Sequence, residues 1–375
     1  MTAYMASTDE IVNWKEEIFH MARVALSGRP QDIHTLIRKL ARKHKADDTE
    51  FAAQLTELLR KSPIQASPAR RAEPAGLPID GDSRLPLVRL AENPVLEIEP
   101  VYADDTWSSL RQIVNEQKGL ERLRAAGIDP TRTVLFTGLP GVGKTFAAKW
   151  IARELGRPLA TLDLSAVMSS FLGRTGNNVR VVLDYAKEHE CVLLLDELDA
   201  VAKRRDDSTE IGELKRLVTV LLQEIDEWPS SGLLLAATNH PDLLDPAVWR
   251  RFETVIDFPM PAPEHLAAVC RDLLDEQEVS AWPEVLGIAL QGSSFSDAVQ
   301  SVRRAKRRAA LQDGDTEPAL IQLVKSIADR LDRAGRQELA VSLVQGVGLS
   351  QRQASDMTGV SRDTIRKHER ETVGG

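Results

Sequence analysis

The stretch TVLFTGLPGVGKTFAAKW, Thr133 to Trp150, determines the expected fold of the central part of the chain. It begins as an apolar run typical of a buried strand and ends in a pattern typical of a helix. Between them lies GLPGVGKT, with three glycines, a lysine and a threonine. Glycine lets the backbone wrap closely around an anion, and the N-terminal end of the following helix favours negative charge. The stretch therefore predicts a phosphate-binding loop of the G-x-x-x-x-G-K-[ST] kind.

This loop predicts nucleotide binding with a defined role for each polar residue. Lys144 is expected to reach the β- and γ-phosphates, and the hydroxyl of Thr145 is expected to hold Mg²⁺. The residues predicted to contact the nucleotide are Gly138, Leu139, Pro140, Gly141, Val142, Gly143, Lys144, Thr145 and Phe146.

Two further apolar runs end in polar residues. CVLLLDELDA reaches Asp196 and Glu197, and two acids at the end of a buried strand are unfavourable unless a cation or water meets them. Asp196 fits the carboxylate on the Mg²⁺ side and Glu197 the general base that activates water, although Glu197 could simply begin the next helix. GLLLAATNH ends in Asn239, which is placed to hold the attacking water. Because ligands bind beyond the C-terminal ends of parallel strands, Lys144, Asp196 and Asn239 should converge. The presence of Glu197 predicts hydrolysis rather than nucleotide-dependent switching alone.

The composition and the pattern of apolar residues change along the chain and divide it into five regions. Strand-like runs alternate with helical patterns over residues 100–259, which predicts an α/β fold with a parallel sheet covered by helices on both faces, as in P-loop NTPases. The flanking regions are a helical bundle over 1–62, a proline-rich linker over 63–99, a small helical lid over 260–315 and a helical C-terminal region over 316–375.

Composition and charge exclude several classes of protein. The net charge of −8 argues against a polyanion-binding surface over the whole molecule, although a local basic patch remains compatible with it. The two cysteines, Cys191 and Cys270, have no metal-ligand spacing, so both are expected to be reduced and buried. No apolar run is long enough to cross a bilayer, and the N-terminus lacks the pattern of a signal peptide. We therefore expect a soluble cytoplasmic protein with no membrane partner.

These motifs, in this order, resemble the AAA branch of the AAA+ ATPases over roughly residues 100–312. The resemblance implies ATP and Mg²⁺ as cofactors, ATP hydrolysis, and self-assembly into a ring, usually a hexamer. LLDPAVWRRFE resembles the arginine-finger segment of the family, with Arg250 and Arg251 at the positions that reach the neighbour's γ-phosphate. The alternative is that these two arginines lie on the surface and form local salt bridges. Gly292, Ser294 and Asp297 resemble the GxSxxD element of the family's helical lid.

The segment SSFLGRTG falls where AAA proteins place a pore loop. Phe171, Leu172 and Gly173 match the aromatic–hydrophobic–glycine order of that loop. An aromatic side chain there grips an extended polypeptide without reading its sequence, because apolar contact needs only bulk. The alternative is that Phe171 packs locally beneath the loop. Lys203–Glu213 lies where the family has a second pore-facing loop, and this assignment is weaker.

The segment LSQRQASDMTGVSRDTIRKHERE, Leu349 to Glu371, resembles a helix-turn-helix over residues 350–370. Ala354, Met357, Val360 and Ile365 supply its inward positions, and Gly359 allows the turn. DNA binding would place Arg362, Asp363, Thr364 and Arg366 in the major groove, with Lys367 and Arg370 near phosphates. The surplus of positive charge is small, so a protein-contact role stays open. A second basic run is either a helix face or ring contact, which we prefer, or a nucleic-acid site. It comprises Arg303, Arg304, Lys306, Arg307 and Arg308.

The expected function is a ring-forming ATPase that unfolds or remodels protein substrates, which the N-terminal bundle would select. An ATP-dependent DNA-associated regulator acting through the C-terminal segment is the alternative, and a nucleotide-gated scaffold is a third class. The sequence contains no protease signature such as HExxH or GxSxG, so proteolysis would need a separate chain. Small bacterial AAA proteins resembling this one act beside effectors such as a subtilisin-like protease, including in defence against phage. By this resemblance, a separate effector or protease chain is a candidate partner.

Overall fold

The computed structural model describes residues 18–24, 30–45, 48–61, 77–80, 86–164, 175–202, 211–274, 281–311 and 315–373. Contacts between residues divide the chain into two compact units. Unit 1 comprises residues 1–97, 110–136 and 145–255, and unit 2 comprises 98–109, 137–144 and 256–375.

A six-stranded sheet forms the centre of the α/β region, with the strand order β1-β3-β4-β5-β2-β6. Strand β3 pairs in parallel with β4, β4 pairs in parallel with β5, and β1 pairs antiparallel with β3 at one edge. The predicted α/β fold is confirmed, with one short antiparallel strand added to the parallel sheet. The strands are β1 (Arg89–Ala91), β2 (Thr133–Thr137), β3 (Leu159–Asp163), β4 (Val192–Asp196), β5 (Leu233–Thr238) and β6 (Thr254–Asp257).

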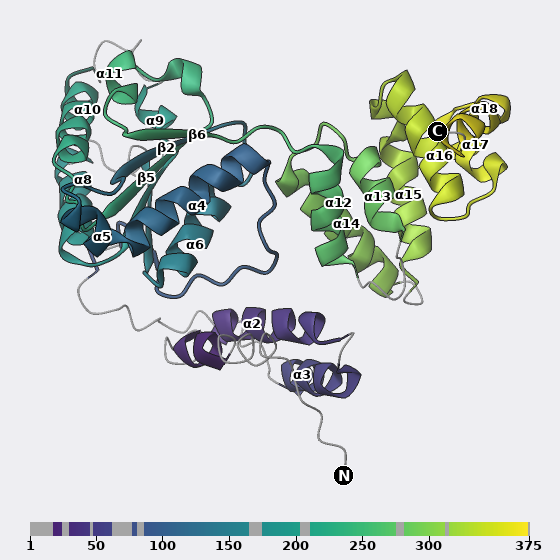
Figure 1. Cartoon of the computed structure of the whole chain (residues 1–375), viewed down its shortest axis with the longest axis horizontal. Helices are drawn as coiled ribbons and strands as arrows, with labels where there is room; N and C mark the ends of the chain where they lie inside the picture. The colour runs from purple at the N-terminus through teal and green to yellow at the C-terminus, as the bar shows by residue number, and fades with distance from the viewer. Residues whose placement is uncertain are drawn as a thin grey trace. The chain divides into compact units, whose positions relative to one another are not determined.

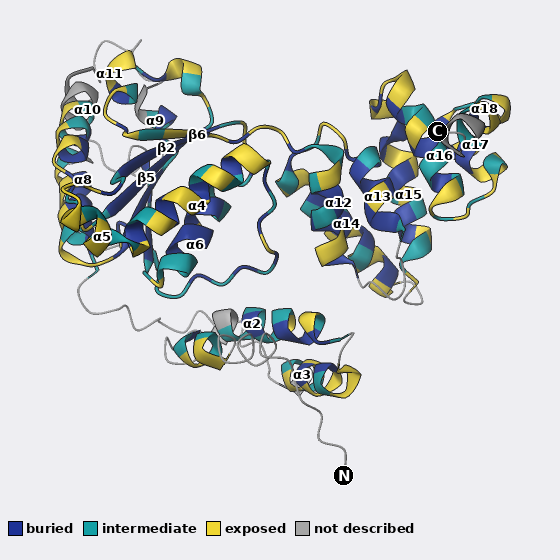
Figure 2. Cartoon of the chain, viewed as in Figure 1, coloured by how far each residue is buried: buried dark blue, intermediate teal, exposed yellow. Residues whose placement is uncertain are grey.

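Helices cover the sheet on both sides, which explains why its strands β2, β4 and β5 are apolar except at their ends. Figure 1 shows α8 (Thr175–Glu188) and α10 (Ile211–Asp226) on one side and α4 (Asp104–Lys118) and α6 (Lys144–Leu155) on the other. Strands β2 and β5 are buried along their whole length (Figure 2). The shorter elements of this region are α5 (Leu120–Ala125), α9 (Asp199–Ala202), η1 (Pro241–Leu243) and α11 (Pro246–Trp249).

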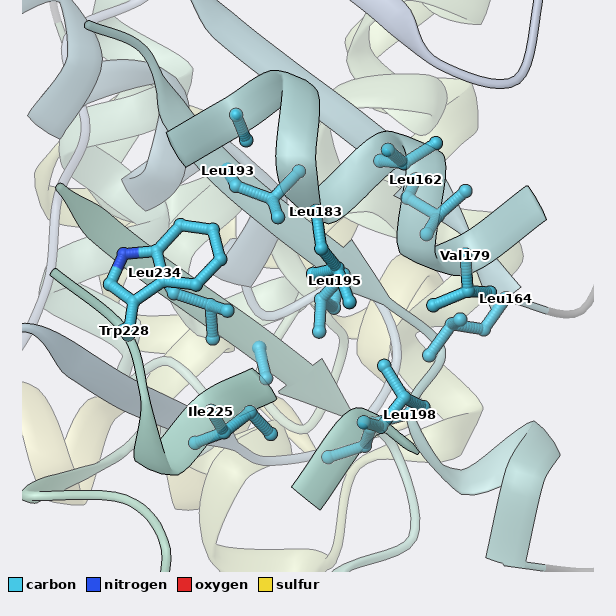
Figure 3. Close-up of a cluster of buried hydrophobic side chains, with 14 of the residues drawn as sticks. Leu162, Leu164, Val179, Leu183, Leu193, Leu195, Leu198, Ile225, Trp228 and Leu234 are labelled. Atoms are coloured by element: carbon cyan, nitrogen blue, oxygen red, sulfur yellow. The ribbon is translucent and has the colours of Figure 1, made fainter. Parts of the chain in front are cut away.

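The largest described core cluster lies between the sheet and helices α8 and α10 (Figure 3). Side chains alternate along a strand, so Leu193 and Leu195 of β4 belong to this cluster while Leu194 does not. Leu183 of α8 and Ile225 of α10 pack against them, and each is at most 2% exposed. Burying a leucine or isoleucine side chain contributes about 1.5–3 kcal/mol, so this face holds the strand ends of the α/β region in fixed positions.

Part of the predicted linker is packed rather than extended. Residues 86–99 lie within the region that composition assigned to a linker, yet they contain strand β1 and the buried Leu87, Val88 and Leu96. An isolated bridge between Ile79 and Pro86 precedes them. The edge of β3 supplies the backbone partners that order this three-residue strand.

The N-terminal region is helical where it is described. Residues 18–24 are helical, and they are followed by α2 (Pro30–Lys43) and α3 (Thr49–Lys61). A small cluster of Val24, Leu36, Leu40, Ala41 and Leu55 forms their shared core. Ile18 and Leu58 do not join this cluster and are 57% and 58% exposed.

Unit 2 is helical after β6. Helix α13 packs against both α12 and α16, so the helices of the predicted lid and of the C-terminal region form one compact body. Its helices are α12 (Pro263–Leu273), α13 (Trp282–Ala289), α14 (Phe295–Leu311), α15 (Glu317–Ile327), η2 (Ala328–Arg330), α16 (Arg333–Gln345), α17 (Gln351–Thr358) and α18 (Arg362–Val373).

Two further observations concern the cysteines and the possibility of a membrane-spanning helix. Cys191 and Cys270 are both free and buried, as expected. Among the helices that the structure describes, none combines the length and the apolar character needed to span a membrane.

Candidate active site

The glycine-rich loop between β2 and α6 adopts backbone conformations that only glycine tolerates easily. Gly138, Gly141 and Gly143 have φ angles of 140°, 80° and 100°. A Cβ atom on Gly141 would lie 2.5 Å from Ser294 Oγ, and one on Gly143 would lie 3.0 Å from the ring of Tyr102. The loop therefore needs glycine both for its turns and for its close approach to other segments of unit 2.

Lys144 is folded back on the loop that precedes it. Its ammonium group donates hydrogen bonds to the carbonyl oxygens of Gly138, at 2.6 Å, and Leu139, at 2.9 Å. The residue is 6% exposed. Leu139 and Pro140 are exposed at the tip of the loop, Val142 is buried, and Phe146 is half-buried in α6.

The end of β4 lies against the first turn of α6 within unit 1. Thr145 Oγ1 donates a hydrogen bond of 3.0 Å to Asp196 Oδ2. Burial raises the pKa of the Asp196 carboxyl, while its hydrogen bonds with Thr145 and with the Glu197 amide lower it. A hydroxyl and a carboxylate held together in this way form a pair of hard oxygen ligands.

Glu197 follows directly and has an unusual backbone. Its φ of 58° makes it the one non-glycine residue with positive φ in the described part of the chain. Its amide donates to Asp196 Oδ1 at 3.0 Å, and the next amide, of Leu198, donates to the Ala237 carbonyl at 2.9 Å. Such a conformation raises the free energy by about 1–3 kcal/mol, and it persists only where neighbouring contacts enforce it.

Asn239 follows β5 and is held through a residue for which the sequence predicted no role. Asp199 Oδ1 accepts hydrogen bonds from the backbone amide of Asn239 and from Thr238 Oγ1, both at 3.1 Å. Asp199 is 6% exposed. An acid two positions after Glu197 was the available signal, but its partners lie on the neighbouring strand and cannot be read from the local sequence.

The two candidate finger arginines differ in their surroundings. Arg250 is exposed and makes no ion pair or side-chain hydrogen bond with described residues. Arg251 forms an ion pair with Asp226, and its side chain is 42% exposed. Both follow the short helix α11, which Asp245 caps by accepting a hydrogen bond from the Ala247 amide.

The lid element lies beside the glycine-rich loop in unit 2. Ser294 Oγ donates to Asp297 Oδ2 at 2.7 Å and accepts from the Asp297 amide at 3.2 Å, which starts helix α14. The Ser296 amide also donates to the Gly141 carbonyl at 3.2 Å.

Phe171, Leu172 and Gly173 lie outside the described residues, as does the segment 203–210 of the second candidate loop.

The C-terminal segment forms two helices, α17 and α18, joined through Gly359 with a φ of 70°. Ala354, Met357 and Ile365 are buried as predicted, and Val360 is partly buried. On α18, Arg362, Arg366 and Lys367 are exposed and Thr364 is half-exposed. Gln351 links the two helices, because its side chain accepts from Arg366 Nε and donates to Glu369 Oε2, both at 2.9 Å.

Comparison with known proteins identifies relatives over most of the chain. The profile of the family described as "ATPase family associated with various cellular activities (AAA)" matches residues 134–260, which include every residue predicted for the nucleotide site and both arginines. An uncharacterised AAA family ATPase of Sinorhizobium fredii, y4kL, is 32% identical over 312 residues, which is 79% of this chain and 92% of that protein.

Other relatives are longer proteins matched in part. A proteasome-activating nucleotidase of Methanococcus maripaludis is 35% identical over 194 residues, or 49% of this chain and 48% of its own length. An ATP-dependent zinc metalloprotease FtsH of Acidothermus cellulolyticus is 30% identical over 274 residues, or 71% of this chain and 38% of its own length. With a relative matched over nearly its whole length and a family profile that covers the loop and strand ends, the chain belongs to the AAA family of ATPases.

Proposed function

We propose that this AAA ATPase hydrolyses ATP with Mg²⁺ in a homo-oligomeric ring, a hexamer, and uses the energy to pull on polypeptide substrates. The hydrogen bond between Thr145 and Asp196, with the strained Glu197 directly after it, is the observation that carries the catalytic part of this proposal. Lys144 of the glycine-rich loop directly precedes Thr145 in the chain.

The residues fit ATP and Mg²⁺. Glycines at positive φ can present backbone amides to phosphates, and Lys144 adds a positive charge at the same loop. Thr145 and Asp196 would hold Mg²⁺, and the partly buried Asp196 carboxylate would gain a cation that offsets its desolvation. Bound Mg²⁺ neutralises charge that develops on the phosphates during hydrolysis.

Glu197 and Asn239 would act on the attacking water. We assign Glu197 as the general base and Asn239 as the group that orients the water. The enforced backbone of Glu197 supports this assignment, because strain of this kind gathers at functional sites. Asp199 would then position Asn239 by accepting a hydrogen bond from its backbone amide, which leaves the side chain of Asn239 to contact the water.

Arg250 and Arg251 would complete the active site of a neighbouring subunit. A guanidinium supplied in trans is worth about 10³–10⁵ in rate. Arg250 is exposed, as a group acting on another chain must be. The exposed ion pair of Arg251 with Asp226 stabilises the chain by only about 0–1 kcal/mol, so assembly could exchange it for a phosphate contact.

Two relatives support a polypeptide substrate. Their names describe a nucleotidase that activates the proteasome and an ATP-dependent metalloprotease, and they match 49% and 71% of this chain. Phe171, Leu172 and Gly173 would grip the substrate in the ring's central channel. The sequence has no protease signature, so a separate effector chain, such as a protease serving anti-phage defence, would carry out any cleavage.

Substrate capture in cells tests this function. The Glu197→Gln variant should bind ATP, fail to hydrolyse it and retain polypeptide clients, which can be identified by crosslinking. Adding Phe171→Ala to the trapped variant should release these clients while ATP stays bound. Recovery of crosslinked DNA instead of protein, unchanged by Phe171→Ala, would contradict the proposal.

DNA binding at α17 and α18 is a second candidate function. The two helices form with their apolar residues inward, which leaves Arg362, Arg366 and Lys367 exposed on α18. A duplex-binding assay at several salt concentrations tests it, since phosphate contacts make affinity fall steeply with salt. If DNA binds here, Lys367→Ala should weaken binding and reduce the salt dependence, while Lys325→Ala on α15 should not.

A further inference from the structure

Tyr102 lies directly against the glycine-rich loop. It precedes α4, belongs to unit 2 with residues 137–144, and is 6% exposed. Its hydroxyl donates a hydrogen bond of 2.9 Å to the carbonyl oxygen of Gly143. The nearest approach of its ring to a Cβ atom on Gly143 would be 3.0 Å, so glycine is what lets the two meet.

Three aromatic rings from separate segments hold the Tyr102 ring in place. Trp107 in α4, Phe258 after β6 and Phe295 at the start of α14 have ring centroids 5.4, 5.3 and 6.4 Å from that of Tyr102. All three contacts are edge-to-face, the geometry that aromatic pairs prefer. Burial also raises the pKa of the Tyr102 hydroxyl far above its ordinary value, so the group stays protonated and remains a donor.

The hydrogen bond fixes the direction of one peptide group. In a trans peptide the carbonyl oxygen and the following amide hydrogen point in opposite directions. With the Gly143 carbonyl held toward Tyr102, the Lys144 amide is therefore directed away from it. Gly141 is held in a similar way, because its carbonyl accepts from the Ser296 amide at 3.2 Å, which directs the Val142 amide to the opposite side.

Other carbonyls of the loop are bound as well. Lys144 Nζ accounts for those of Gly138 and Leu139. An anion-binding loop needs its amides turned inward and its carbonyls turned outward, since an inward carbonyl would repel phosphate. The contacts of the Gly141 and Gly143 carbonyls hold them toward the protein, and Tyr102 is the donor for the peptide nearest α6.

We propose that Tyr102 is a positioning residue of the ATP site, whose hydroxyl orients the Gly143–Lys144 peptide so that the Lys144 amide faces the bound phosphates. This inference rests on the proposed phosphate-binding role of the loop. It assigns the hydroxyl a role that phenylalanine could not fill, since the ring contacts with Trp107, Phe258 and Phe295 need no oxygen atom.

The test compares Tyr102→Phe with Tyr185→Phe in the full-length protein. Tyr185 is a half-buried tyrosine of α8, in unit 1, whose ring stacks on His189. Losing one hydrogen bond from a binding loop should raise the KM for MgATP and the Kd for ADP about 3- to 10-fold. Because both the ground state and the transition state use this amide, kcat should change less than KM. Tyr185→Phe should change none of these values.

Kinetic constants equal to those of wild type in Tyr102→Phe would overturn the inference. A Tyr102→Phe protein that fails to fold, as judged by thermal melting, would overturn it too, because the hydroxyl would then serve the fold rather than the nucleotide. Lys144→Ala and Glu197→Gln test the underlying function separately. If both of those abolish hydrolysis while Tyr102→Phe behaves as wild type, only the role of Tyr102 is wrong.

Discussion

Arg251 is paired with Asp226 at the C-terminal end of α10, within the same chain. Both side chains are well exposed, at 42% and 39%. The pair is therefore weak, and an arginine required by a neighbouring subunit could leave it at little loss of stability. The ion pair gives Arg251 a resting position that is compatible with action in trans.

Opposite effects are expected from removing the two partners of this pair. Asp226→Asn frees Arg251 and should leave the ATPase rate of the assembled protein unchanged or higher. Arg251→Ala should lower that rate by about 10³-fold or more if the guanidinium stabilises the transition state. Steady-state ATPase assays on assembled protein distinguish these outcomes. Equal losses in the two variants would indicate that the ion pair itself matters.

The pair of Thr145 and Asp196 predicts a dependence on Mg²⁺. Asp196→Asn removes the charged oxygen ligand and should lower the ATPase rate at limiting Mg²⁺ by about 10–100-fold, with partial recovery as Mg²⁺ is raised. Asp184→Asn, the same substitution at an exposed position of α8, is the matched control. A Mg²⁺ titration of the rate gives the answer, and identical curves for the two variants would remove Asp196 from the metal site.

The positive φ of Glu197 predicts a trade-off between stability and activity. Glu197→Gly relieves the backbone strain, so its melting temperature should equal or exceed that of wild type. The variant should nevertheless lose hydrolysis by about 10²–10⁴-fold, because the general base is gone. Thermal melting and ATPase assays on the same preparation check both halves. An active Glu197→Gly protein would show that another group activates the water.

The two cysteines should resist thiol reagents while the protein is folded. Burial raises the pKa of the Cys191 thiol to about 11 and that of Cys270 to about 12. A thiol is protonated below its pKa, so at pH 8 about one Cys191 thiol in a thousand is ionised, and the thiolate is the reactive form. Titration with a chromogenic disulfide should give no fast reaction until denaturant is added. Rapid labelling of the native protein would show that a thiol is accessible.

Strong local patterns made much of the fold predictable. The runs that became β2, β4 and β5 are apolar except at their end residues, and the glycine-rich loop has a spacing that few other structures require. The C-terminal helices were also predictable, since the inward residues Ala354 and Met357 lie three positions apart on α17 and Ile365 lies on α18 beyond Gly359.

The features that the sequence did not reveal depend on contacts between distant segments. Strand β1 has three residues and no periodicity of its own, and it is ordered by pairing with β3. Tyr102 lies about forty positions before the carbonyl it binds, and the partners of Asp199 are on the next strand of the sheet. The left-handed backbone of Glu197 likewise follows from hydrogen bonds around it rather than from its own preference.

Mixing two inactive variants tests most directly whether neighbouring subunits complete each other's active sites. An Arg250→Ala/Arg251→Ala protein keeps Glu197, and a Glu197→Gln protein keeps both arginines. In a randomly mixed ring about one interface in four would pair an intact base with intact arginines. The account predicts that ATPase activity absent from each protein alone appears on mixing. A mixed assembly with no activity, or an arginine variant as fast as wild type, would contradict it.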